Sequence, residues 1–248
     1  MINPEGQDTS WAGIYKLGAA AALGAVFTGL LEIAISFFPG GSAHQETVLE
    51  WFMLFQDNWF LGLRNLGLLN LILNTIGLLV YFAIFAALRK SKYFPYAALA
   101  LLFAFLGIGV FYATNRAFPM LDLSKQYLLA ATGAERALLE AAGKSMITVG
   151  GSHTPGTFLG FFLAEIAGIL MSIAMLRSDV FNRATAYLGI LGFSSLLIFE
   201  FSASFLSGLT DAAMLFAVLG GLLTMGWYIL IARRLFQLAR TENMVAEA

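Results

Sequence analysis

The sequence predicts an all-α membrane protein, a polytopic bundle of about six transmembrane helices. Of its 248 residues, 59% are hydrophobic and only 12% are charged, and the mean hydropathy is +0.80. A soluble domain of this length needs a more highly charged surface. Several stretches also exceed the roughly 18 apolar residues that a membrane-spanning helix requires. These stretches lack the alternation of outer-membrane β-strands, so helices are expected.

Charged or polar turns divide the apolar stretches into six predicted spans within a single membrane domain, residues 1–248. The spans are residues 12–38, 60–88, 95–115, 155–176, 184–206 and 212–232. Nine of the fourteen basic residues then fall on one side of the membrane: Lys16, Arg89, Lys90, Lys92, Arg177, Arg183, Arg233, Arg234 and Arg240. Because basic residues accumulate on the cytoplasmic side, we expect a cytoplasmic (inner) membrane protein with both termini in the cytoplasm.

Between the first two spans, residues 46–59 ("ETVLEWFMLFQDNW") are too apolar for a simple loop. Trp51, Phe55 and Trp59 are four residues apart, which places them on one face of a helix. Such a helix is expected to lie at the outer membrane interface.

Between the third and fourth spans, residues 121–143 are expected to form two short helices on the same outer side. Thr132 and Glu135 have the spacing of a capping box, and Gly143 is expected to end the second helix. Two interpretations of the outer segments stay open: helices that decorate the interface, or a lid over an outward-facing cavity.

Small and polar residues recur at helical spacing in four spans. Gly18, Gly67, Gly156 and Gly160 belong to these stripes, which predict close helix packing because small side chains let backbones approach. Asn70 and Asn74 lie on the stripe of the second span. They are expected either to bond a neighbouring helix or to line a site.

Three carboxylates lie within the predicted spans: Glu32, Glu165 and Glu200. Placing a carboxylate in the middle of the bilayer costs about 2.5 kcal/mol or more. All three fall in the outer half of the bundle if the orientation above holds. We therefore predict a ligand-binding cavity there, lined by Glu32, Arg64, Asn70, Asn74, Glu165 and Glu200, with Asn115, Arg116 and His153 at its rim.

Charge pairing distinguishes these acids. One of them is expected to pair with Arg64, since a guanidinium can hold a carboxylate through two hydrogen bonds. At least one acid then lacks a fixed cationic partner. Glu165 lies deepest and is expected to carry a proton, either as a functional group or as the donor of an interhelical hydrogen bond.

The sequence disfavours several classes of site. It contains no cysteine, so disulfides and thiolate metal sites are excluded. With two histidines, no metal site and no cofactor are expected. The net charge of −1 and the lack of a basic tract argue against binding of nucleic acid.

Two stretches resemble an uncharacterised bacterial family of six-span integral membrane proteins, known only as a domain of unknown function. They are "YKLGAAAALGAVFTGLLE" and "GTFLGFFLAEIAGILMSIAMLRSDVFNRATAYLGILGFSSLL". The second joins a Gly-rich span through Leu-Arg-Ser to an Arg-led span. The resemblance implies the six-span fold and assigns no catalytic residue, and residues 116–153 are longer here than in that family.

The leading functional prediction is a membrane protein that binds a lipid or a small amphiphilic ligand in its cavity. Two alternatives are a proton-coupled transporter with Glu165 as the coupling acid, and an intramembrane enzyme that uses Glu165 and Glu200 as an acid–base pair. A structural subunit is a further alternative. Membrane lipids, a second copy of the chain or a larger membrane complex are the expected partners.

Overall fold

A computed structural model describes residues 11–36, 45–206, 208 and 210–246. Its long helices are α1 (Ala12–Ser36), α4 (Leu68–Ala87), α5 (Phe94–Thr114), α8 (Phe158–Leu176), α9 (Arg183–Phe205) and α10 (Thr210–Ala246). All six are long and apolar enough to cross a membrane. No strand occurs in these described ranges, so the predicted all-α bundle of a multi-pass membrane protein is confirmed.

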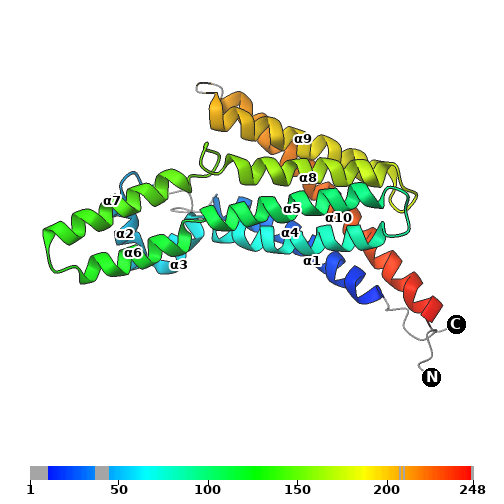
Figure 1. Ribbon diagram of the computed structural model, residues 1–248, viewed down its shortest axis with the longest axis horizontal. Helices are drawn as coiled ribbons and strands as arrows, with labels where there is room; N and C mark the ends of the chain where they lie inside the picture. Colours follow the sequence, from blue (N-terminus) through cyan, green and yellow to red (C-terminus); the bar gives the residue numbers. More distant parts are fainter. Residues whose placement is uncertain (1–10, 37–44, 207, 209, 247–248) are drawn as a thin grey trace.

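The contacts between the six long helices close into a ring. Around the ring, α1 packs against α4, α4 against α5, α5 against α8, α8 against α9, α9 against α10, and α10 against α1. The α4–α5 turn, the α8–α9 turn, the start of α1 and the end of α10 lie at one end of the bundle, on the right in Figure 1. All the basic residues that the sequence analysis placed on one side therefore belong to one end, the basic end.

Two long helices differ from their predicted bounds. The second span begins at Leu68 instead of residue 60, because Gly67 adopts a left-handed conformation (φ 101°) that interrupts the helix. The preceding residues form the separate helix α3 (Trp59–Asn65). The sixth span continues as α10 to Ala246, well beyond residue 232. Residues 37 and 38, the end of the first predicted span, lie outside the described residues.

The other helices form an outer layer beyond the far end of the ring (Figure 1, left). It consists of α2 (Val48–Asp57), α3, α6 (Ala117–Leu129) and α7 (Gly133–Val149). Its own small core is made by Trp51, Phe52, Phe55, Leu63, Leu66, Ala117 and Met120. Capping boxes start α2 at Thr47 and α7 at Thr132. The outer segments thus pack on one another as a folded layer.

Two details of the outer layer differ from the sequence interpretation. Trp59 belongs to α3 and is exposed, so it does not share a helix face with the buried Trp51 and Phe55. Gly143 does not end α7. A Cβ at this position would come within 2.6 Å of Val48 Cγ1 and 3.0 Å of Phe52 Cζ, so the glycine lets α2 cross closely.

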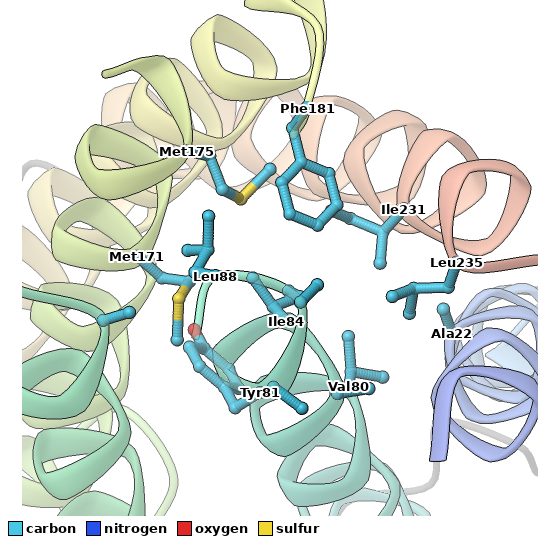
Figure 2. Close-up of a cluster of buried hydrophobic side chains, with 14 of the residues drawn as sticks. Ala22, Val80, Tyr81, Ile84, Leu88, Met171, Met175, Phe181, Ile231 and Leu235 are labelled. Carbon is cyan, nitrogen blue, oxygen red and sulfur yellow. The ribbon is translucent and has the colours of Figure 1, made fainter. Parts of the chain in front are cut away.

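The main hydrophobic core fills the ring towards the basic end. Figure 2 shows side chains from α4, α8 and α10, and from the segments that follow α4 and α8, converging there: Val80, Tyr81, Ile84, Leu88, Met171, Met175, Phe181, Ile231 and Leu235. Buried Met and Leu side chains leave little room for water at this end. Nearer the outer layer, the interior of the ring opens into a cavity.

Candidate functional site

A cavity of about 190 Å³ lies inside the ring, between the main core and the outer layer. Five of the six long helices line it, and α1 contributes no lining residue. The polar lining residues are Asn70, Asn74, Tyr81, Glu165, Thr224 and Tyr228. The remaining wall is apolar or small: Leu73, Gly77, Ala104, Ile108, Phe161, Ala164, Phe193 and Leu196.

Glu165 reaches this cavity because α8 packs very closely on α5. A Cβ at Gly107 would approach the backbone nitrogen of Ala164 to 2.9 Å, and one at Gly160 would approach Phe111 N to 3.4 Å. These small residues bring the two backbones together, as the sequence stripe predicted. Phe161 and Glu165, one turn apart on α8, both line the cavity.

One carboxylate oxygen of Glu165 lacks a partner. Among the described residues, Oε2 is buried and has no hydrogen-bond partner. A buried polar atom left unsatisfied typically costs about 1–3 kcal/mol, and more when it is charged. The site is therefore destabilising unless something within the cavity satisfies this oxygen.

Asn70 and Asn74 line the same cavity. Asn74 Nδ2 donates a hydrogen bond to the backbone oxygen of Asn70, at 2.8 Å, one turn earlier on α4. Gly77 follows on this face. It is buried, yet a Cβ built on it meets no atom within 4 Å, so the side-chain direction of residue 77 points into open cavity.

The structure places Glu32 and Arg64 outside the cavity. Arg64 Nη2 lies 3.8 Å from Glu32 Oε1, and Arg64 Nη1 donates to Asn65 Oδ1 at 2.9 Å. This ion pair connects α1 to α3 and is the acid–Arg64 clamp that the sequence analysis expected. It is a structural contact between the ring and the outer layer.

Glu200 is also outside the cavity and has a different partner. Its Oε2 lies 2.6 Å from His153 Nδ1, and its Oε1 accepts a hydrogen bond from Ser204 Oγ at 3.1 Å. The Glu200 side chain is 2% exposed and that of His153 is 39% exposed. The predicted rim residue His153 thus joins the α7–α8 loop to α9.

A single aromatic ring separates this His–Glu pair from the cavity. The His153 ring stacks on Phe161, with centroids 4.9 Å apart, and Phe161 lines the cavity. His153 also contacts Phe199 edge-on at 4.7 Å. Glu165 lines the cavity and Glu200 does not.

The two other rim residues hold the α5–α6 junction. Asn115 Oδ1 accepts a hydrogen bond from Ala117 N at 3.0 Å, and Arg116 Nη1 donates to Ile147 O of α7 at 2.9 Å. These bonds start α6 and tie α7 to the junction. Neither residue lines the cavity.

Sequence reasoning missed two tyrosines of the site, Tyr81 and Tyr228. Tyr81 continues the stripe of Asn70, Asn74 and Gly77 at helical spacing, so extending that stripe by one turn would have found it. Tyr228 lies one turn after Thr224 in an apolar run, and no comparable signal marks it.

No protein-family model, curated protein or solved structure matches the chain. The resemblance to the bacterial family of unknown function therefore stays a prediction, and the function has to be inferred from the chain's own geometry.

Proposed function

We propose that this multi-pass membrane protein binds a small amphiphilic molecule in the central cavity, with Glu165 as the principal polar contact. The cavity has a polar side, formed by amides, phenols and the carboxylate, and an apolar side, formed by aromatic and aliphatic side chains. Such a division suits a ligand that has both a polar and an apolar part.

The surroundings of the three intramembrane acids support this proposal. Glu200 contacts His153 and Ser204, and Glu32 contacts Arg64 through Oε1 at 3.8 Å, although its Oε2 has no hydrogen-bond partner among the described residues. Glu165 also has an unsatisfied oxygen, and it is the one of these three acids that lines the cavity. Polar and ionisable residues inside membranes usually mark function, because each is costly to keep there.

The volume of the cavity narrows the choice of ligand. About 190 Å³ corresponds to about six water molecules at roughly 30 Å³ each. Sites for drug-sized ligands measure about 300–1,000 Å³. A small molecule, or the head group of a lipid, is therefore favoured over a complete lipid.

Packing energetics also favour an occupant. An unfilled cavity costs free energy, because the side chains that line it lose packing contacts. Water satisfies the polar groups well but gains little from the apolar wall, whereas an amphiphile contacts both.

We further infer that the basic end faces the cytoplasm, with both termini on that side of the cytoplasmic (inner) membrane. Nine basic residues gather at the turns and helix ends there, in agreement with the positive-inside rule. The outer layer then lies on the opposite side, and the cavity lies in the outer half of the bundle. The surrounding lipids are the partners this arrangement implies.

Filling the cavity tests the proposal. Gly77→Leu places its side chain in the cavity, whereas Gly109→Leu on α5 adds the same atoms at an exposed position. Full-length protein is purified gently from native membranes, and small molecules bound to it are measured by native mass spectrometry. We expect wild type and Gly109→Leu to retain a small molecule that Gly77→Leu loses. Equal retention by both variants, or no bound molecule in wild type, would refute the proposed function.

A further inference from the structure

We infer that the ligand of the central cavity is a small organic cation, such as a quaternary or protonated amine; this inference rests on the proposed function. It adds a chemical class, which follows from the charges and the aromatic rings around the cavity.

The cavity becomes negatively charged when Glu165, which is expected to carry a proton, is ionised, and a bound cation favours that ionised form. Glu165 is its acidic lining residue, and none of the lining residues that the structure describes is a lysine, arginine or histidine. Nearby basic groups have contacts elsewhere: Arg64 with Glu32, Arg116 with Ile147 O, and His153 with Glu200. A cationic ligand would supply the missing countercharge, while an anionic one would add to the negative charge.

The aromatic lining suits a cation as well. Tyr81, Phe161, Phe193 and Tyr228 come from four different helices and all line the cavity. The face of an aromatic ring is electronegative and attracts cations, and groups of such rings recognise quaternary ammonium ions.

Trp227 holds three of these rings in place. It is fully buried behind the cavity wall, and its ring contacts Phe193 at 5.3 Å, Tyr228 at 5.0 Å and Tyr81 at 6.3 Å between centroids. A site whose rings are fixed before binding loses less conformational freedom when the ligand enters. The wall is therefore preorganised.

An organic cation explains the lining better than a metal ion does. Metal ions such as Mg²⁺ and Ca²⁺ require several oxygen ligands, and aromatic rings do not provide them. In the described part of the chain, no three His, Asp or Glu side chains gather closely enough to hold a metal. An alkylammonium ion uses both features present here, the carboxylate and the rings.

Comparing choline with a neutral molecule of the same shape shows whether the positive charge of the ligand matters for binding. The neutral isostere of choline, in which a carbon atom replaces the nitrogen, has almost the same size and hydroxyl group. Binding of radiolabelled choline to the full-length protein is measured at equilibrium, with the isostere as competitor. We expect the isostere to compete at least tenfold more weakly than unlabelled choline.

Three variants complete the test. Glu165→Gln removes the charge at nearly constant shape and is expected to weaken choline binding at least tenfold. Tyr228→Leu removes a ring and is expected to weaken choline binding at least threefold without affecting the isostere. Glu140→Gln is the matched control, because it makes the same substitution in the outer layer, where Glu140 accepts a hydrogen bond from the Tyr127 hydroxyl. This variant should leave choline binding unchanged.

The cation inference is overturned if the isostere competes as well as choline, if Glu165→Gln retains wild-type affinity, or if wild type does not bind choline. Even then, the proposed function is supported if wild type retains a small molecule in native mass spectrometry and Gly77→Leu does not. If wild type retains no molecule, or Gly77→Leu retains as much as Gly109→Leu, the proposed function itself is refuted. The choline experiment and the retention experiment therefore fail independently.

Discussion

Removing the imidazole of His153 should destabilise the fold through Glu200. The carboxylate of Glu200 is almost fully buried, and its partners in the structure are His153 Nδ1 at 2.6 Å and Ser204 Oγ at 3.1 Å. Breaking a fully buried charge pair by deleting one partner costs about 3–5 kcal/mol. Because the His153 side chain is 39% exposed, water lowers this penalty, and we expect about 2–3 kcal/mol for loss of the imidazole.

The backbone of His153 allows a sharper experiment. Its φ of 55° lies in the left-handed region, where alanine is strained by about 1 kcal/mol, glycine is not, and asparagine is tolerated. His153→Gly therefore removes the imidazole without strain, and His153→Asn also keeps a hydrogen-bond donor near Glu200. The expected order of stability is wild type, His153→Asn, His153→Gly and then His153→Ala.

Thermal unfolding of the purified protein in detergent measures this order. For a chain of this size, 1 kcal/mol shifts the midpoint by about 2–4 °C, so His153→Gly should unfold about 4–12 °C below wild type and His153→Ala about 2–4 °C lower still. In a Glu200→Gln background no buried charge is left unpaired, and His153→Ala should cost at least 1 kcal/mol less. Equal costs in both backgrounds would refute the reasoning that couples His153 to Glu200.

Two further predictions concern helix packing. Gly18→Ala should lower the unfolding midpoint by several degrees, because the new Cβ would overlap Ala83 Cβ of α4. Gly24→Ala on the same helix is the control: its new Cβ would lie 3.7 Å from the nearest atom, so this variant should be neutral or stabilising. Equal unfolding midpoints for the two variants would contradict the close crossing of α1 and α4. Arg89→Gln should lower the free energy of unfolding by about 1–2 kcal/mol, because Arg89 forms an ion pair with Glu242 at 2.9 Å that glutamine cannot form. The unfolding midpoint measures this change as well. An unchanged midpoint would show that this contact between the α4–α5 turn and α10 does not stabilise the bundle.

Hydropathy and charge predicted most of the fold, because membrane helices must be long, apolar and bounded by polar turns. The start of α4 was misplaced because residues 60–66 are mostly apolar too, and the left-handed Gly67 that separates α3 from α4 has no distinct sequence signal. Gly143 was misread for a related reason. A glycine can end a helix or let another helix cross, and the sequence does not distinguish the two uses.

The sequence predicts how deep in the membrane each acid of the candidate site lies, but not which way its side chain points. Counting residues from the ends of the spans locates Glu32, Glu165 and Glu200 along the membrane normal. Which way each acid points depends on the rotation of its helix within the ring. In a soluble protein the apolar face reveals this rotation, but in a membrane both the lipid-facing and the buried faces are apolar. In the structure Glu165 lines the cavity, whereas Glu32 and Glu200 lie outside it.

The position of Glu165 argues for function more strongly than its presence does. A carboxylate at this depth is costly, and so is a cavity of about 190 Å³ in an otherwise packed interior. Two independent costs at one place are hard to explain by stability, since a leucine at residue 165 would reduce both. Glu32 and Glu200, by contrast, each have a partner from another segment of the chain and stabilise the contacts they make. An acid with an unsatisfied oxygen beside a cavity lined by aromatic rings is the arrangement that the proposed binding function requires.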